Sequence, residues 1–367
     1  MPSLLDPLPI RGLTFTSRIF VSPMCQYSSD DGFANDWHLV HLGSRAVGGA
    51  ALVFTEATAV TPEGRISPED LGIWKDEHVA MLARIVRFVH AQGSQAGIQL
   101  AHAGRKGSTW RPWAAGKGSV PRAEGGWTAV APSPVAFEGY ATPTALDERG
   151  IRGVVEAFAA AAVRAREAGF RVAEIHAAHG YLLHQFLSPL SNQRGDAYGG
   201  SFENRTRLVR EVVDAVRRVW PERRPLFVRV SGTDWVDGGW DADQTVELAR
   251  QVKPLGVDLV DCSSGGLVAH AKIPVAPGYH VPFAERVRRE AGLPSGAVGL
   301  ITSAAQADEI VRTGRADAVL LARQMLRDPY FPLRAALELG QPMAWPAQYL
   351  RAAPPGTAAR TPSGDPA

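Results

Sequence analysis

The sequence predicts an α/β protein with a (β/α)8 TIM barrel fold. Eight short runs rich in Val, Ile and Leu recur along the 367 residues, and segments with helical periodicity separate most of them. This alternation favours a parallel sheet with both faces covered, and eight strands are the number that closes such a barrel. A doubly wound sheet is the alternative. It is less favoured because no G-x-G-x-x-G loop follows a strand and no G-x-x-x-x-G-K-[ST] loop occurs.

The predicted elements follow the chain in order. Strands are expected at 18–22, 51–55, 95–100, 171–175, 226–230, 258–262, 296–300 and 316–321. Helices are expected at 78–92, 152–168, 202–219, 242–253, 281–290, 303–313 and 333–339. Gly93, Gly169 and Gly314 directly follow three of these helices, as is typical of a helix that ends on a left-handed residue.

The domain organisation is expected to be simple. Residues 1–351 are expected to form one barrel domain, with a long insertion after the third strand. This insertion, residues 104–148, is rich in Gly, Pro, Trp and Ser, and loops of such length in a compact domain are usually functional lids or substrate walls. Residues 352–367 are rich in Pro, Ala and Gly, so we expect a disordered tail.

Composition limits the class of protein. The net charge of +2 gives no general attraction to nucleic acid or to an anionic membrane. No run of 18 apolar residues and no secretory signal pattern occurs, so no membrane segment is expected. The two cysteines, Cys25 and Cys262, cannot form a disulfide framework, a four-cysteine zinc site or an iron–sulfur cluster. A reducing cytoplasm is the simplest interpretation.

Chemically capable residues follow the ends of the predicted strands, where the loops of a barrel converge on one active site. The fourth strand is followed by His176, His179 and Tyr181. Two imidazoles could donate hydrogen bonds to an oxyanion, with the phenol as a proton source. A zinc pair and purely structural histidines are the alternatives. The zinc alternative needs further ligands, and we expect Glu174 to point to the other side of the strand, while no H-E-x-x-H motif occurs.

Four motifs in order carry a resemblance to a known family. They are the stretch 176–205, which reads HAAHGYLLHQFLSPLSNQRGDAYGGSFENR, together with SPMCQY at 22–27, TEATAVTPEGR at 55–65 and QLAHAGRK at 99–106. The chain therefore resembles the Old Yellow Enzyme family of ene-reductases and NADPH dehydrogenases, in the cysteine-containing branch that is sometimes called thermophilic-like. The resemblance extends from about Leu5 to Arg351.

This resemblance implies a site for FMN across the top of the barrel. Gln99 and Arg229 are expected to hydrogen-bond the pyrimidine edge of the flavin, where a cation stabilises the anionic reduced form. Pro23, Met24 and Ala57 are expected along the ring, with the Cys25 thiol near its N5–C4 carbonyl edge. The residues expected to hold the phosphate are Ser264, Gly265, Gly299, Ala322 and Arg323. Ala322 departs from the glycine common in the family, which restricts φ but keeps the N–H donor.

The resemblance also implies roles around the substrate. His176 and His179 are expected to donate to the carbonyl oxygen of the substrate, and Tyr181 to protonate its α-carbon. Tyr27 and Lys106 are expected in the substrate pocket. Arg351 matches an arginine that reaches into the neighbouring subunit, which implies a homodimer or homotetramer.

The expected function is that of a cytoplasmic, FMN-dependent NAD(P)H:alkene oxidoreductase that needs no metal. NADPH or NADH would supply hydride, and the substrate would be a small activated alkene such as an α,β-unsaturated carbonyl compound. Two other functions remain as alternatives. One is a metal-dependent barrel hydrolase with His176 and His179 as ligands. The other is a flavin-binding redox sensor that has no substrate.

Overall fold

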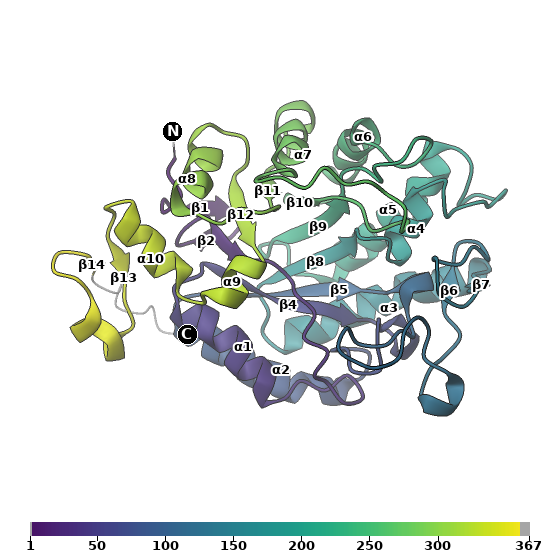
Figure 1. Ribbon diagram of the computed structural model, residues 1–367, viewed down its shortest axis with the longest axis horizontal. Coiled ribbons are helices and arrows are strands. Elements are labelled where there is room, and N and C mark those ends of the chain that lie inside the picture. The colour runs from purple at the N-terminus through teal and green to yellow at the C-terminus, as the bar shows by residue number, and fades with distance from the viewer. Residues whose placement is uncertain (1, 360–367) are drawn as a thin grey trace.

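The computed structural model of the chain describes residues 2–359 and contains the predicted (β/α)8 barrel. Eight strands form a closed barrel in which every neighbouring pair is parallel. Helices surround these strands (Figure 1). The barrel strands, in chain order, are β3 (Ile19–Val21), β4 (Leu52–Ala59), β5 (Gln95–Ala101), β8 (Val172–Ala177), β9 (Leu226–Ser231), β10 (Leu259–Ser263), β11 (Ser295–Ala297) and β12 (Ala318–Leu321).

The remaining elements lie around the barrel or at its ends. The α-helices are α1 (Asp36–Val47), α2 (Val79–Ala91), α3 (Glu148–Glu167), α4 (Leu182–Leu187), α5 (Phe202–Val219), α6 (Ala242–Val252), α7 (Val281–Arg286), α8 (Ala304–Arg312), α9 (Arg323–Arg327) and α10 (Phe331–Glu338). Short strand pairs are β1 (Leu8–Ile10) with β2 (Leu13–Phe15), β6 (Val130–Ala131) with β7 (Thr144–Ala145), and β13 (Met343–Ala344) with β14 (Ala358–Ala359). The 3-10 helices are η1 (Pro62–Gly64), η2 (Asp76–His78), η3 (Gly104–Lys106), η4 (Arg122–Glu124) and η6 (Ala347–Ala352), and η5 (Val287–Ala291) is a π-helix.

Burial on both faces explains the apolar character of the barrel strands. All eight residues of β4 are buried, as are all six of β8 and of β9. A first core cluster fills the layer between strands and helices. A second fills the amino-terminal end of the barrel, where Phe20, Phe54 and Phe227 meet the β1–β2 hairpin through Phe15. The chemistry is thereby left to the opposite end, at which the strands finish.

Helix starts are set by side-chain caps. Asn35, Asp147, Ser201, Asp241 and Ser303 each accept a hydrogen bond from a backbone N–H in the first turn of the helix that follows. Such a cap contributes about 1 kcal/mol to stability. These helices pack between consecutive strands and fix where each strand ends.

One barrel helix, α1, was not among the predicted helices. Its periodicity is blurred, because His38 and His41 are buried while Trp37 and Val40 are exposed. The helix starts with a capping box in which the partner of Asn35 is His38, instead of the usual Glu or Gln. Both features hide the helix from a search for apolar periodicity.

The seventh strand is shorter than predicted. β11 ends at Ala297, whereas the sequence predicted a strand through Leu300. Gly299 and Leu300 have φ values of 102° and 51°, so the chain turns into the left-handed region there. Apolar composition alone did not reveal this turn, which leads into the site.

The insertion after β5 and the C-terminal segment lie at opposite ends of the long axis in Figure 1. The insertion contains η3, η4 and the β6–β7 pair. Of the expected disordered tail, residues 352–359 are described and include β14, which pairs with β13, whereas residues 360–367 lie outside the described part of the chain. Within residues 2–359, no helix combines the length and the apolar character that a bilayer span requires.

Candidate active site

The predicted donors come together at the carboxyl end of β8. His176 is still within the strand, and the turn after it carries His179 and Tyr181. The ring centroids of His176 and His179 are 5.1 Å apart, and those of His176 and Tyr181 are also 5.1 Å apart, both in edge-to-face arrangement. His179 and Gly180 have φ values of 59° and 73°, so the turn is left-handed at two successive residues. The sequence pattern therefore placed these three side chains correctly in one cluster.

Burial fixes the protonation states of this cluster. Desolvation, followed by the nearby Arg229 cation, lowers the pKa of His176 and of His179 well below the usual value. Both imidazoles are therefore neutral at pH 7, and each offers one N–H donor. Burial raises the pKa of Tyr181 well above its usual value, so the phenol stays protonated. The cluster is thus a set of neutral donors.

The two histidines differ in how the protein holds them. His179 Nε2 lies 2.7 Å from Ser263 Oγ, and its backbone N–H donates to Ser231 Oγ at 2.9 Å. His176 Nδ1 is buried and has no hydrogen-bond partner among the described residues. A buried nitrogen without a partner costs free energy unless a ligand supplies one. His176 is therefore the donor most clearly available to a bound molecule.

The prediction for Glu174 was wrong. Residues two apart in a strand share a face, so Glu174 lies on the same side of β8 as His176. Its Oε1 accepts a hydrogen bond of 2.7 Å from Gln99 Nε2. Beside them, the Arg229 guanidinium pairs with Asp261 at 3.0 Å. Burial, reinforced by Asp261, raises the pKa of Glu174 to about 8, and burial raises that of Asp261 to about 6.

This polar cluster does not favour a metal. Within residues 2–359, no group of three or more His, Cys, Asp and Glu side chains is arranged to hold a metal ion. Glu174 is taken up by Gln99, and the nitrogen of His179 that is hydrogen-bonded faces a serine. The predicted flavin partners Gln99 and Arg229 instead both lie close to the Glu174 carboxyl, which accepts the hydrogen bond from Gln99 and interacts with the charge of Arg229.

The segment after β3 forms a second wall of the site. The backbone N–H of Gln26 donates to Glu56 Oε2 at 2.8 Å, which ties the SPMCQY segment to β4, and His38 lies 3.2 Å from the other oxygen of Glu56. Burial, with Asp70 and Glu56 adding to it, raises the pKa of Cys25, so its thiol is not ionised at pH 7. Pro23, Met24, Cys25 and Tyr27 are all partly buried on this segment.

A small apolar cluster joins this wall to the others. It contains Ala57 and Ala101 and is covered by Cys25, Tyr27 and Tyr181. A register shift in β4 places Ala57 directly opposite Gln99. The side chain at position 57 is thus small where the predicted flavin ring would lie, and the two predicted flavin contacts are neighbours on adjacent strands.

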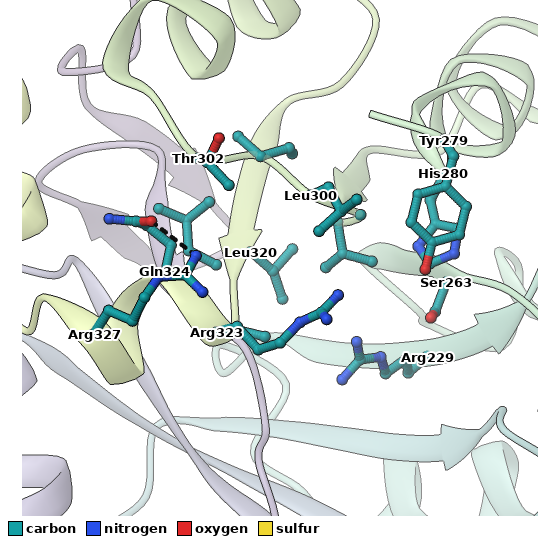
Figure 2. A pocket seen from close by; sticks show the side chains of 15 residues that line it. Arg229, Ser263, Tyr279, His280, Leu300, Thr302, Leu320, Arg323, Gln324 and Arg327 are labelled. Carbon is teal, nitrogen blue, oxygen red and sulfur yellow. Dashed lines mark hydrogen bonds between the residues drawn. The ribbon is translucent and has the colours of Figure 1, made fainter. Parts of the chain in front are cut away.

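A cavity of about 130 Å³ lies at the ends of β9 to β12 (Figure 2). Four predicted cofactor residues line it: Arg229, Gly299, Ala322 and Arg323. Figure 2 shows the Arg229 and Arg323 guanidinium groups facing the same space. Two cations and the flexible backbone of Gly299 are suited to an anionic group such as a phosphate.

The fit of this cavity to a phosphate-bearing cofactor is supported by His280. Its side chain is only 4% exposed, yet neither ring nitrogen has a hydrogen-bond partner among the described residues. A Cβ added at Gly299 would lie 3.0 Å from this ring, so glycine is required there. Burial and the nearby Arg229 lower the pKa of His280 to about 3. The sequence analysis missed His280, together with Ser263, Tyr279, Thr302 and Arg327, which also line the cavity.

Three residues that were expected to hold the phosphate are Ser264, Gly265 and Ala322. Ser264 and Gly265 are not among the residues that line the cavity: the Ser264 hydroxyl accepts from the Trp235 indole at 2.8 Å, and the Gly265 N–H donates to Thr233 at 2.9 Å. The neighbouring Ser263 lines it. Ala322 lines the cavity, and its φ of −100° lies outside the left-handed region that favours glycine.

The last two predicted substrate residues lie apart. Lys106 is partly buried at the end of η3, and its Nζ donates to the backbone carbonyls of His179 and Gly266. Arg351 is exposed in η6, beside the exposed side chains of Tyr349 and Leu350. The structure therefore brings Lys106 to the predicted site but leaves Arg351 on the surface of the single chain.

Comparison with known proteins agrees with this geometry. Residues 3–341 match the model of the NADH:flavin oxidoreductase / NADH oxidase family. The chain belongs to this family. It is 50% identical over 351 residues to the NADPH dehydrogenase of Halalkalibacterium halodurans, covering 95% of this chain and 98% of that protein. The resemblance to the Old Yellow Enzyme family is thereby confirmed, and the chain is an oxidoreductase that uses FMN with a reduced nicotinamide nucleotide.

Solved structures show the same fold in related enzymes. Morphinone reductase in complex with tetrahydroNAD superposes with a TM-score of 0.77 and 29% identity, covering 95% of this chain and 94% of that one. The Old Yellow Enzyme homologue from Zymomonas mobilis gives a TM-score of 0.76 and 26% identity, covering 94% of each chain. Both likenesses extend over nearly the whole chain.

Proposed function

We propose that this protein is an FMN-dependent NAD(P)H:alkene oxidoreductase that reduces the C=C bond of activated alkenes such as α,β-unsaturated carbonyl compounds. The observation that carries the proposal is the cluster of His176, His179 and Tyr181 as neutral, buried donors beside predicted flavin contacts: His176 is opposite Arg229 in the β8–β9 register, and Tyr181 packs on the cluster that contains Ala57. When bound, FMN would supply the hydride chemistry between the reduced nicotinamide and the β-carbon of the alkene.

The histidine pair orients the alkene and stabilises the charge that develops on it. Negative charge moves to the carbonyl oxygen as hydride arrives at the β-carbon, so two donors fixed in advance lower the barrier. Their low pKa values are compatible with this role, because each neutral imidazole still has one N–H group to donate to the carbonyl oxygen. Ser263 holds His179 in place, whereas His176 has its Nδ1 free for a ligand.

Tyr181 then protonates the α-carbon. Its O–H bond breaks as the new C–H bond forms, and the electron pair remains on the phenol oxygen until solvent returns a proton. A raised pKa makes the phenol a weak acid, but an enolate carbon is a sufficiently strong base to take its proton.

The cofactor would be held from both ends. Gln99 and Arg229 would contact the pyrimidine edge, and the residues along the ring would be Pro23, Met24, Cys25 and Ala57. Arg323, Gly299, Ala322 and the region of Ser264 and Gly265 would hold the phosphate, to which the cavity adds Ser263 and His280. We place the chain in the cysteine-containing branch because Cys25 is on this wall.

Several finer features are part of the same proposal. Tyr27 and Lys106 would border the substrate pocket. Arg351 would reach a neighbouring subunit in a homodimer or homotetramer, consistent with its exposure on the surface of a single chain. The proposed location is the cytoplasm, because the two cysteines form no disulfide in the structure.

The experiment that tests the proposal follows the colour of the purified protein without oxygen. NADPH should bleach the flavin absorbance, and 2-cyclohexen-1-one should then restore it at a rate that increases with alkene concentration. Bleaching without alkene-dependent recovery would favour the redox sensor and contradict the ene-reductase. A colourless protein with stoichiometric zinc would contradict both.

A further inference from the structure

Lys106 lies where three loops of the site meet. Its Nζ donates hydrogen bonds of 2.8 Å to the carbonyl of His179, after β8, and of 2.9 Å to the carbonyl of Gly266, after β10. The same ammonium group lies 4.9 Å from the ring centroid of Phe137 in the insertion and 5.1 Å from that of Tyr181. One side chain from the loop after β5 thus contacts both proposed catalytic partners, His179 through its backbone and Tyr181 through its ring.

The two turns that Lys106 bridges are packed backbone to backbone. A Cβ at Gly180 would lie 2.2 Å from the Gly266 carbonyl oxygen, and a Cβ at Gly266 would lie 2.8 Å from the His179 carbonyl carbon. Two carbonyl groups brought so close need a shared donor, because buried carbonyls without partners are costly. The left-handed conformation of His179 costs a further ~1–2 kcal/mol, which contacts of this kind must offset.

The second feature of Lys106 is the positive charge that it places beside Tyr181. Burial is the first cause that raises the pKa of Tyr181, so the surroundings of this phenol disfavour the negative charge that it carries after it gives up its proton. Among the described contacts of the Tyr181 ring, the cation is Lys106. Burial and the adjacent Arg105 lower the pKa of Lys106 to about 8, so the amine still carries its proton at pH 7.

We propose that Lys106 is a positioning residue: its ammonium group holds the His179–Gly180 turn against the Gly266 turn, and it supplies the positive charge that faces Tyr181 when that phenol gives up its proton. This inference rests on the proposed function, because it takes Tyr181 as the proton donor. It gives Lys106 a role that acts through His179 and Tyr181, in place of direct contact with the substrate.

Three variants separate donors from charge. Lys106→Arg keeps both, Lys106→Gln keeps N–H donors without charge, and Lys106→Met removes both. Lys117→Met, at an exposed lysine of the same insertion, is the matched control. The measurement is the single-turnover rate at which 2-cyclohexen-1-one restores the flavin absorbance of the NADPH-reduced holoenzyme, with FMN content and melting temperature recorded for every variant.

The expected order of rates is Arg, then Gln, then Met, with the Met variant slower than the control by about 10–100-fold, which is at most the lower end of a full general-acid contribution because Lys106 acts through Tyr181. FMN content should be unchanged. In a Tyr181→Phe background, Lys106→Met should slow the reaction much less, because the phenol on which the charge acts is absent. Equal slowing in both backgrounds would overturn the proposed action on Tyr181.

The outcomes distinguish this inference from the function on which it rests. A wild-type holoenzyme that the alkene does not reoxidise would overturn the proposed function. An active wild type with Lys106→Met equal to Lys117→Met would overturn only the role of Lys106. If the Met variant fails to hold FMN, the Arg and Gln variants decide, and equal rates for these two would overturn the role of charge.

Discussion

The two ends of the site differ in how their polar groups are satisfied. At the β8 end, protein atoms fix the catalytic turn: Ser231 and Ser263 hold His179, and Lys106 bridges its carbonyl to the next turn. At the β11–β12 end, the cavity contains a buried His280 that has no partner within residues 2–359, and two arginines that face the same space. The β8 end leaves one nitrogen of His176 for a bound substrate, whereas the β11–β12 end is built around an anionic group that the chain does not supply. This difference separates catalysis from cofactor binding.

The largest effect should come from the β8 end. Replacing both His176 and His179 by Ala should slow alkene reduction by about 10³-fold or more, since each lost oxyanion donor costs roughly 10²–10³-fold. FMN content should not change, because the cofactor is held elsewhere. The measurement is NADPH oxidation with 2-cyclohexen-1-one in the absence of oxygen, with His270→Ala at an exposed histidine as control. A double variant as active as that control would contradict the assignment.

Tyr181→Phe should have a smaller effect at the same end. We expect the alkene half of the reaction to slow by about 10²-fold, as is usual for a lost general acid, while reduction by NADPH remains near the wild-type rate. Stopped-flow absorbance measures the two halves separately. Equal slowing of both half-reactions would indicate that Tyr181 has a packing role, and it would contradict the role of Tyr181 as proton donor at the β8 end.

Glu174 lies between the two ends and tests the polar cluster at the centre of the barrel. Burial raises its pKa to about 8 in the folded protein, so the unfolded chain binds fewer protons than the native one between about pH 4.5 and 8. Stability should therefore fall as pH rises through this window, by at most about 1.4 kcal/mol per pH unit. In Glu174→Gln this part of the fall should be absent. Urea unfolding at several pH values measures it, and parallel curves for both proteins would refute the raised pKa.

The smallest effect should come from the β11–β12 end. His280→Phe keeps a buried ring but removes both nitrogens, so FMN should bind more weakly by about fivefold, the value of one neutral hydrogen bond. Fluorescence titration of the FMN-free protein gives the dissociation constant, and His270→Phe provides the control. An unchanged constant would mean that His280 does not contact the cofactor.

The sequence predicted the barrel and most of the site because both depend on local patterns. All eight barrel strands coincide with predicted apolar runs, and the HAAHGY motif placed His176, His179 and Tyr181 in one cluster. What it missed depends on three-dimensional packing. α1 was hidden by its two buried histidines, and the face of Glu174 was assigned against the two-residue period of a strand.

His280 shows the limit of motif analysis most clearly. A histidine at the start of α7 carries no signal in the sequence, and its importance comes from burial without a partner. The choice between Ser263 and Ser264 likewise depends on which side chain faces the cavity, and the Trp235 indole decides it by binding Ser264. Lys106 belonged to a recognised motif, but its two carbonyl partners come from loops about 70 and 160 residues away in the chain.

We propose that one site holds a flavin beside a histidine pair that binds an oxygen anion. The most direct measurement is the visible spectrum of the purified protein during titration with a phenol. We expect flavin bands at the start and a saturable change in them as phenol binds, which the His176→Ala/His179→Ala variant should lack although it retains the flavin. A protein without flavin bands, or a variant that binds the phenol as tightly as the wild type, would contradict the account.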